Sequence, residues 1–362
     1  MAMRGREALV MVGAAAGLFV CAAMLAQPGV APAAPVAAAA TVSRPPTITI
    51  TAVGDLLFDS APKRLIQSSG GKAPFAAVAS RLNKADVTVG NLECALSNRG
   101  TPVPGKAFTF RGDPRAVDGL RWAGFDLLAL GNNHARDYGD LALRDTFANL
   151  GRARIAYAGA GVNRAAAWRP ATITRKGAKI AFLSFSQIGP STFAATPSRS
   201  GTLYTMDTAA VKRAIRSAST RSDYVIVSFH WGVEKEYYPT SRQVRDGRAA
   251  IDAGADVVLS HHPHRIQGVE YYKGRLIAYS LANFVFSPGS EGGRDTMILH
   301  ATLTPKGVVR ATAEPIYIGA YGKPVPAKGA TADRIIGIIK RTSAARGTRV
   351  AVSGTTVRLA PR

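Results

Sequence analysis

Short apolar runs rich in Val, Ile and Leu alternate along the chain with segments whose apolar residues recur at helical spacing. The apolar runs predict strands at residues 47–53, 87–90, 127–130, 179–184, 224–229, 257–260 and 275–279. The helical spacing predicts helices at residues 74–83, 137–149, 206–217 and 241–253. This alternation is typical of an α/β domain rather than of a β-sandwich or a helical bundle.

The pattern changes toward the C-terminal end of the chain. Residues 296–304 and 308–317 predict a hairpin around Pro305 to Gly307, and residues 332–346 predict a helix. A further helix is expected after the turn at residues 159–161, with Asn163 as its N-cap. We therefore expect a main domain at residues 47–304, with residues 305–362 as a small strand and helix extension of the same domain.

The first 46 residues lack the alternating pattern. Arg4 and Arg6 precede an uncharged apolar run at residues 8–26, so residues 1–26 predict a signal peptide or a retained signal anchor. Residues 27–46 are mostly Ala, Pro and Val and predict a linker without a face to bury. Both interpretations place the rest of the chain outside the cytoplasmic membrane, secreted or anchored to its outer face. Membrane contact is expected only through an uncleaved N-terminal segment.

The chain is strongly basic, with a formal net charge of +23 that falls to +22 when Arg4, Arg6 and Glu7 are set aside. This charge predicts attraction to polyanions of the cell envelope. Nucleic acid is not expected as a partner, because no recognition motif or aromatic platform accompanies the charge. The two cysteines are Cys21, inside the targeting run, and Cys94, so we expect no intramolecular disulfide after cleavage.

Polar residues follow the predicted strands at the points where the strands end. Because parallel strands present their carboxyl ends at one edge of a sheet, these distant segments are expected to converge on one site. The residues are Asp55, Asn91, Glu93, Asn132 to His134, His230 and His261 to His264.

The most specific local motif is His261-His262-Pro263-His264, which holds three of the six histidines. His262 and His264 lie two residues apart after a strand and can point the same way, and neutral imidazole is a common metal ligand. His261 is expected to face elsewhere. The alternative is a polar surface loop.

The other polar segments each have a simpler interpretation when taken alone. Asn132 and Asn133 suit a turn, Asp137 suits the cap of the following helix, and His230 suits a core histidine. Asp55 and Glu93 suit caps or turns. Taken together they favour a metal site, because two adjacent carboxylates repel each other unless a cation or proton lies between them.

In order along the chain, these motifs resemble the CapA-type capsule synthesis proteins, which are associated with poly-γ-glutamate capsules and related to calcineurin-like metallophosphoesterases. The resemblance spans about residues 48–303. The motifs that carry it are Val53-Gly54-Asp55, Gly90-Asn91-Leu92-Glu93, Gly131-Asn132-Asn133-His134 with Asp137-Tyr138-Gly139, His230-Trp231-Gly232, His261-His262-Pro263-His264 and Tyr279-Ser280-Leu281-Ala282-Asn283-Phe284.

The resemblance implies a metallophosphoesterase-like α/β sandwich of two packed sheets flanked by helices, with one or two divalent ions. Mn, Zn and Fe all suit such ligands. It also implies roles for single residues. His134 resembles the general acid, the candidate metal ligands are Asp55, Glu93, Asn133, His230, His262 and His264, and the candidate substrate-binding residues are Asn91, Lys106 and Arg111.

Two departures from the pattern stand out. Leu57 occupies the position where phosphoesterases usually carry the histidine of an Asp-x-His motif, which removes one ligand. Ala282 replaces a glycine that is common in the family.

Two functions follow as hypotheses. The first is a metal-dependent hydrolase of phosphoester or amide bonds. The second is a non-catalytic envelope component that binds or guides an anionic polymer such as poly-γ-glutamate. Under both, the resemblance implies a membrane-bound polymer synthase as a partner.

Overall fold

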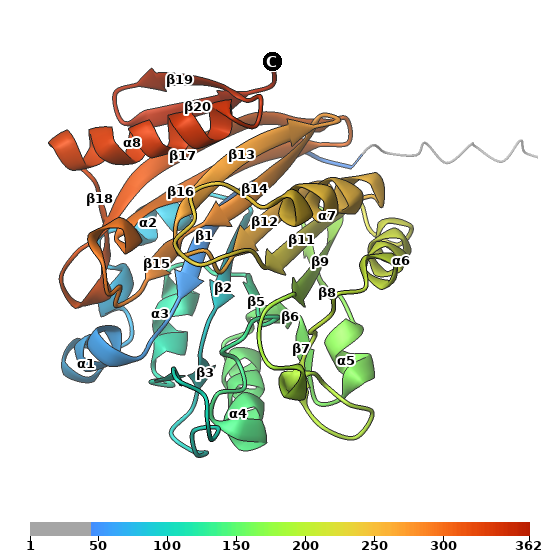
Figure 1. Ribbon diagram of the computed structural model, residues 1–362, viewed down its shortest axis with the longest axis vertical. Helices are drawn as coiled ribbons and strands as arrows, with labels where there is room; N and C mark the ends of the chain where they lie inside the picture. The colour runs from blue at the N-terminus through green and yellow to red at the C-terminus, as the bar shows by residue number, and fades with distance from the viewer. Residues whose placement is uncertain (1–44) are drawn as a thin grey trace, which may run out of the picture. The chain divides into compact units, whose positions relative to one another are not determined.

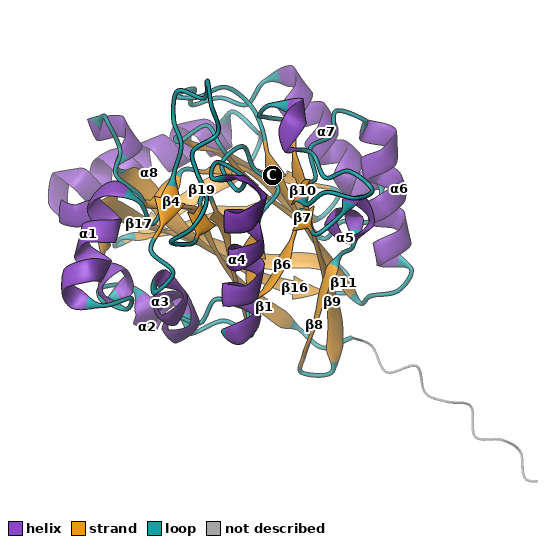
Figure 2. Cartoon of the chain, turned by 90° about the horizontal axis from the view of Figure 1, so that it is seen from below, coloured by secondary structure: helices purple, strands orange, loops and turns teal. Residues whose placement is uncertain are grey.

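Two β-sheets pack face to face at the centre of the molecule, and helices cover their outer faces (Figures 1 and 2). The computed structural model describes residues 45–362. The predicted targeting segment, residues 1–26, and residues 27–44 of the predicted linker lie outside the described residues. The predicted fold class, a sandwich of two sheets flanked by helices, is confirmed.

The larger sheet has ten strands in the order β19-β20-β17-β16-β1-β2-β5-β6, with β15 paired to β1 and β18 paired to β17. Strands β1, β2, β5 and β6 are parallel, and β16 pairs antiparallel with β1 and with β17. The strands are β1 (Ile48–Leu56), β2 (Val87–Leu92), β5 (Leu127–Ala129), β6 (Ala156–Ala158), β15 (Asn283–Val285), β16 (Asp295–Thr304), β17 (Gly307–Ile318), β18 (Pro324–Pro326), β19 (Arg349–Ser353) and β20 (Thr356–Ala360).

The smaller sheet has six strands in the order β13-β14-β12-β11-β9-β8, and its four central strands are parallel. They are β8 (Ala171–Arg175), β9 (Ala178–Ser186), β11 (Tyr224–His230), β12 (Val257–His261), β13 (Ile266–Tyr272) and β14 (Arg275–Leu281). Two minor pairs complete the strands: β3 (Ala95–Leu96) with β4 (Arg111–Gly112), and β7 (Ala160–Gly161) with β10 (Gly201–Thr202).

Helices pack on the outer face of each sheet. On the larger sheet lie α1 (Ser60–Ser69), α2 (Ala79–Leu82), α3 (Ala116–Trp122) and α4 (Gly139–Arg152). On the smaller sheet lie α5 (Arg164–Trp168), α6 (Thr208–Ser219) and α7 (Ser241–Asp252). Helix α8 (Gly329–Ala344) contributes Ile335 and Ile339 to the core between the sheets. Short 3-10 turns are η1 (Ala73–Phe75), η2 (Ser191–Phe193), η3 (Glu291–Gly293) and η4 (Ala320–Gly322).

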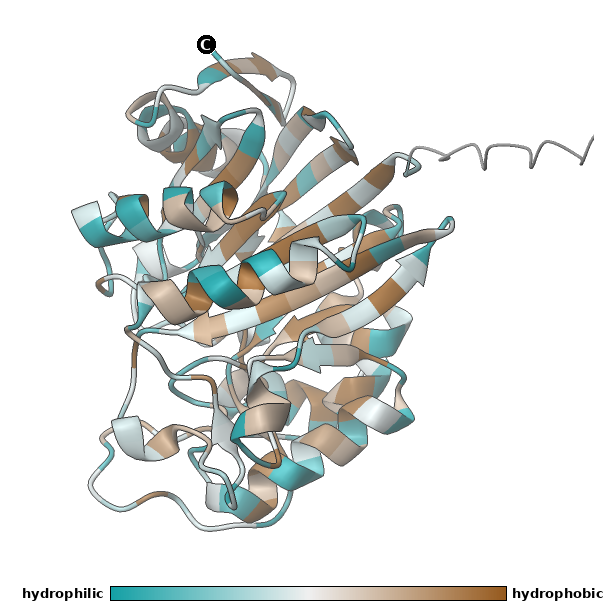
Figure 3. Ribbon diagram, turned by 90° about the vertical axis from the view of Figure 1, so that its right-hand side faces the viewer, coloured by the Kyte–Doolittle hydropathy of each residue, from teal (hydrophilic) through white to brown (hydrophobic). Residues whose placement is uncertain are grey.

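Burial explains why the strands read as unbroken apolar runs. Every residue of β2, β11 and β12 is buried, because these strands are covered on both faces. Figure 3 shows the resulting bands of hydrophobic residues along the strands, with hydrophilic residues on the helices. Within residues 45–362, none of the helices has the length and apolar character that a membrane span needs.

Most predicted elements of this region are present. The seven predicted strands correspond to β1, β2, β5, β9, β11, β12 and β14, and the predicted hairpin is β16 with β17. Asn163 caps α5 as expected by accepting a hydrogen bond from the Ala166 amide. The single helix predicted at residues 74–83 is wrong. That segment divides into η1 and α2 because the backbone leaves the helical region at Val78, where φ is −127°.

Gly54 lies where the end of β1 closely approaches the connection between β14 and β15. A Cβ atom there would lie 1.9 Å from the Ala282 carbonyl oxygen, which belongs to a rigid backbone segment. We expect Gly54→Ala to lower the free energy of unfolding by about 3 kcal/mol or more. The same change at Gly151 in α4, where nothing lies within 4 Å, should raise it by about 0.5–1 kcal/mol. Urea unfolding of both variants checks this, and equal effects would contradict it.

Candidate metal centre

The strand registers bring the polar strand ends together. In the larger sheet, Asp55 of β1 lies beside Asn91 of β2 and Asn283 of β15. In the smaller sheet, His230 of β11 lies beside His261 of β12. Contacts then join the two sheets. His261 Nδ1 lies 3.2 Å from Asp55 Oδ1.

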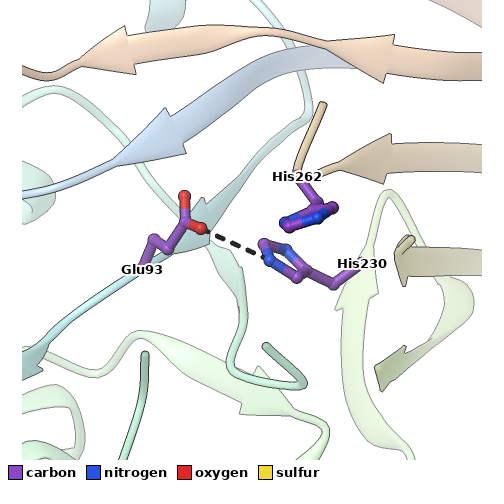
Figure 4. Close-up of side chains that lie close together, drawn as sticks. All are labelled: Glu93, His230 and His262. Atoms are coloured by element: carbon purple, nitrogen blue, oxygen red, sulfur yellow. Dashed lines mark ion pairs between the residues drawn. The ribbon is translucent and has the colours of Figure 1, made fainter. Parts of the chain in front are cut away.

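Two further contacts extend this junction. His230 Nε2 lies 3.3 Å from Glu93 Oε1 (Figure 4), and His264 Nδ1 lies 3.3 Å from Asp55 Oδ2. His262 follows β12 and places its ring centroid 4.9 Å from that of His230. Four segments that lie far apart in the sequence, which carry Asp55, Glu93, His230 and His261 to His264, therefore meet at one place.

Three overlapping sets of side chains have ligand atoms that all lie within 4.8 Å of one another. They are Glu93 with His230 and His262, Asp55 with Glu93 and His264, and Glu234 with His262 and His264. The sets share Glu93, His262 and His264, so the cluster is continuous. Its atoms are carboxylate oxygens and imidazole nitrogens, the donor types that Zn, Mn and Fe accept.

Several of these atoms are buried without a hydrogen-bond partner among residues 45–362. They include Asp55 Oδ2, both carboxylate oxygens of Glu93, and Nδ1 of His262. A buried polar atom left unsatisfied costs about 1–3 kcal/mol. These atoms belong to the residues of the overlapping ligand sets, so a cation bound there would satisfy them. The donor set fits a divalent metal.

The two carboxylates differ in their electrostatics. Burial, together with the neighbouring charge of Asp55, raises the pKa of Glu93 well above its ordinary value. Burial acts the same way on Asp55, but the imidazoles of His261 and His264 outweigh it and hold the pKa of Asp55 well below its ordinary value. Without a cation, the raised pKa of Glu93 favours its neutral form, and the neighbouring imidazoles favour the charged form of Asp55.

The histidines are suited to metal coordination. Burial, followed by the proximity of other imidazoles, lowers the pKa of His262 to about 3 and that of His230 well below its ordinary value. Both rings are therefore neutral near neutral pH and keep a free lone pair. His264 Nδ1 lies 2.8 Å from the Asn283 side-chain oxygen, which fixes the orientation of the ring.

A chain of amides supports the cluster. Asn91 Nδ2 donates to Asp55 Oδ1 at 2.8 Å, and Asn132 Nδ2 donates to Asn91 Oδ1 at 3.0 Å. Asn91 is fully buried, so its amide orients Asp55. The oxygen of Asn133, a predicted ligand, lies 2.7 Å from His230 Nε2. Asn133 therefore belongs to the same cluster.

His134, the predicted general acid, sits in a separate triad beside the cluster. Its Nδ1 lies 2.7 Å from Asp137 Oδ2 and 2.9 Å from Lys106 Nζ, and Lys106 pairs with Asp137 Oδ1 at 2.5 Å. A carboxylate only accepts hydrogen bonds, so Nδ1 carries the proton toward Asp137 Oδ2, Lys106 donates to Asp137 Oδ1, and Nε2 of the neutral ring is unprotonated. The simpler interpretation of Asp137 as the cap of the next helix is wrong, because Tyr138 occupies the N-cap of α4 and Asp137 contacts His134 and Lys106.

Arg111, the third predicted substrate-binding residue, has different neighbours. Its guanidinium donates to the Arg99 and Gly100 carbonyls at 3.2 and 3.0 Å and stacks over the Tyr138 ring at 4.5 Å. These contacts stabilise the loop before β4. Of the predicted basic pair, Lys106 therefore contacts His134, whereas the contacts of Arg111 are with this loop.

Three residues at the cluster were not expected from the sequence. His261 was expected to face elsewhere, and this is wrong, because strand pairing with His230 turns it toward Asp55. Glu234, four residues after His230, lies with His262 and His264 in one of the ligand sets, and no local sequence pattern indicates this. Asn283 belongs to the motif at residues 279–284, for which the sequence indicated no role, and its side-chain oxygen orients His264.

The backbone around the cluster is strained. His262, His264 and Ala282 have positive φ angles of 95°, 54° and 60°, which side chains with a Cβ atom rarely adopt. Such residues persist where the surrounding structure holds them, commonly at functional sites. The glycine that the family resemblance implied at position 282 would adopt this conformation without strain.

Comparison with known proteins places the chain among capsule synthesis proteins. The family model described as "Bacterial capsule synthesis protein PGA_cap" matches residues 49–288. The PGA biosynthesis protein CapA of Bacillus subtilis is 31% identical over 278 residues, covering 76% of this chain and 73% of that protein. The capsule biosynthesis protein CapA of Bacillus anthracis is 29% identical over 289 residues, covering 78% and 70%.

Solved structures give a weaker likeness. The NAD nucleotidase NadN of Haemophilus influenzae is 12% identical, covers 82% of this chain and 63% of that chain, and has a TM-score of 0.45. That score is too low to carry an inference.

The buried position of Glu93 predicts a pH-dependent stability in the metal-free chain. Because the pKa of Glu93 is raised in the folded state, the folded chain binds the proton more tightly and loses stability as pH rises above the unfolded value of about 4.3. Glutamine does not ionise, so Glu93→Gln should be the more stable protein in chelator, by about 1–3 kcal/mol near pH 8 and by less near pH 5.

Denaturant unfolding at both pH values measures this difference. The matched control is Glu236→Gln, which changes an exposed glutamate and should alter stability little at either pH. An equal effect of Glu93→Gln at both pH values would contradict the prediction.

Proposed function

The chain belongs to the family of bacterial capsule synthesis proteins, and on that premise we propose that it is an exported, metal-dependent hydrolase of phosphoester or amide bonds in the synthesis of a poly-γ-glutamate-like envelope polymer. One observation carries the proposal: buried carboxylate and imidazole atoms from distant segments share a centre and lack hydrogen-bond partners among residues 45–362. Burying polar and charged atoms without partners costs free energy, unless a ligand such as a metal ion binds them.

We propose that the cluster holds one or two divalent ions of Mn, Zn or Fe. The ligands would be Asp55, Glu93, Asn133, His230, His262 and His264. When bound, such ions act as Lewis acids and lower the pKa of a coordinated water.

The protein's own contribution lies beside that centre. Asp137 keeps the proton of His134 on Nδ1 and stabilises the imidazolium when Nε2 gains a second proton. In that form His134 can donate the Nε2 proton to a departing oxygen or nitrogen. Burial lowers the pKa of His134, so the ring releases this proton readily. Lys106 neutralises Asp137 and keeps the triad rigid.

Location outside the cytoplasmic membrane is part of the proposal. It is supported by the basic and apolar character of residues 1–26 and by the capsule biosynthesis names of the relatives. A membrane-bound polymer synthase is the partner that such a location favours.

Metal analysis separates this proposal from its alternatives. We expect the purified protein to contain at least one equivalent of Mn, Zn or Fe, and His262→Ala to lose most of it together with turnover of bis(p-nitrophenyl) phosphate. His300→Ala is the matched control, because His300 lies on β16 and its ring contacts Thr51 of β1 and Glu314 of β17, away from the cluster. His134→Ala should keep the metal and lose turnover by about 10²–10⁴-fold. Full activity of wild-type protein that contains no metal would contradict the proposal.

A second candidate function has its own support. Leu57 is buried in the hydrophobic core on the larger sheet, so this position supplies no ligand, and the chain carries a net charge of +23. Both observations favour a non-catalytic component that binds or guides an anionic polymer.

Polymer binding tests this second candidate. If it is correct, poly-γ-glutamate should bind with an affinity that falls steeply between about 50 and 200 mM salt and survives chelation, since surface charges are screened by salt. Fluorescence anisotropy with labelled polymer measures this. Binding that is undetectable, or that disappears with EDTA, would count against the second candidate.

A further inference from the structure

Arg265 is a buried arginine without an acidic partner. The residue is 8% exposed and directly follows His264 in the cluster. Its guanidinium donates to the His264 carbonyl at 2.9 Å and to the Ser290 hydroxyl at 3.1 Å, which are both neutral. Among residues 45–362, no carboxylate lies within ion-pair distance of it. Arginines are rarely buried unless they are paired.

The unpaired guanidinium lines a cavity that reaches the cluster. The cavity has a volume of ≈ 180 Å³, and its walls include Lys235, His264, Arg265 and Asn283. This is room for several waters or for a small ionised group. The lining carries two cations and no carboxylate. It shares His264 and Asn283 with the metal-ligand cluster.

The surroundings of Arg265 are shaped to hold its side chain in place. A Cβ atom at Gly292 would lie 3.2 Å from Arg265 Nε, and one at Gly293 would lie 3.3 Å from one of its terminal nitrogens. The ring of Tyr237 lies 5.8 Å from the guanidinium carbon. The two glycines therefore leave room for the planar group, whose fixed fork suits two oxygens of one anion.

We propose that Arg265 and Lys235 form an oxyanion subsite that holds a carboxylate or phosphate group of the substrate next to the metal-ligand cluster. The anion would supply the missing charge for the guanidinium, and the adjoining bond would then lie beside His264. This inference deepens the proposed function and rests on it for the identity of the reaction. The binding itself depends only on residues of the cavity.

The test is equilibrium binding of two probes, tri-γ-glutamate and inorganic phosphate, to the full chain by calorimetry, with and without EDTA. Arg265→Gln removes the positive charge and the paired N–H donors of the guanidinium and leaves a polar side chain of similar shape. It should weaken binding by about tenfold to a hundredfold while metal content is unchanged. Arg216→Gln on the exposed surface of α6 is matched for net charge and should have little effect.

A second variant keeps the test decisive if Arg265→Gln folds poorly. Lys235 is exposed and has a φ of 67°, which asparagine tolerates, so Lys235→Asn should fold and weaken binding by a few-fold. Stronger binding of the tripeptide than of phosphate identifies carboxylate as the ligand, and the reverse order identifies phosphate. Absence of binding by wild type, or equal losses in Arg216→Gln, overturns the subsite.

The experiment also separates failure of the subsite from failure of the proposed function. Anion binding that depends on Arg265 in a protein without metal would leave the subsite standing and remove the hydrolase. If the protein binds metal but Arg265→Gln leaves anion binding unchanged, the subsite is wrong and the hydrolase proposal stands.

Discussion

The structure depends on holding two carboxylates, Asp55 and Glu93, close together in a buried position. Both are at most 1% exposed, and the charge on one raises the pKa of the other. Like charges in such surroundings repel strongly, so the arrangement survives only with compensating cations or protons. The imidazoles of the smaller sheet partly supply this compensation. The electrostatics of the site therefore depend on the packing of the sheets, because the imidazoles compensate the carboxylates only while both sheets are in contact.

The backbone at the ends of the strands shows the cost of that contact. Gly54 approaches the Ala282 carbonyl so closely that a side chain has no room, and the Asp55 amide donates to the same carbonyl at 2.9 Å. Ala282, His262 and His264 take positive φ angles to aim their neighbours at the cluster. Strain concentrated at a few residues that surround unsatisfied ligand atoms is expected where binding, rather than stability, has shaped a site.

The sequence was most informative where one physical signal dominated. Strands such as β11 and β12 are buried on both faces, so their apolar runs are unmistakable, and the polar residues at their ends follow directly. The division of residues 73–82 was not predictable, because helical spacing of apolar residues does not report the backbone angle at Val78. The placement of His261 and Arg265 depends on strand register and on a loop after β15, and neither leaves a local pattern.

The absence of a histidine at position 57 does not by itself leave the centre short of imidazoles. Leu57 packs in the core, but His261, unexpectedly, brings another ring within 3.2 Å of Asp55. Both ring nitrogens of His261 are buried without a hydrogen-bond partner among residues 45–362, which is the state of a ligand or of a costly defect. The imidazoles around Asp55 therefore come from His261 and His264, and the apolar residue at position 57 does not remove them.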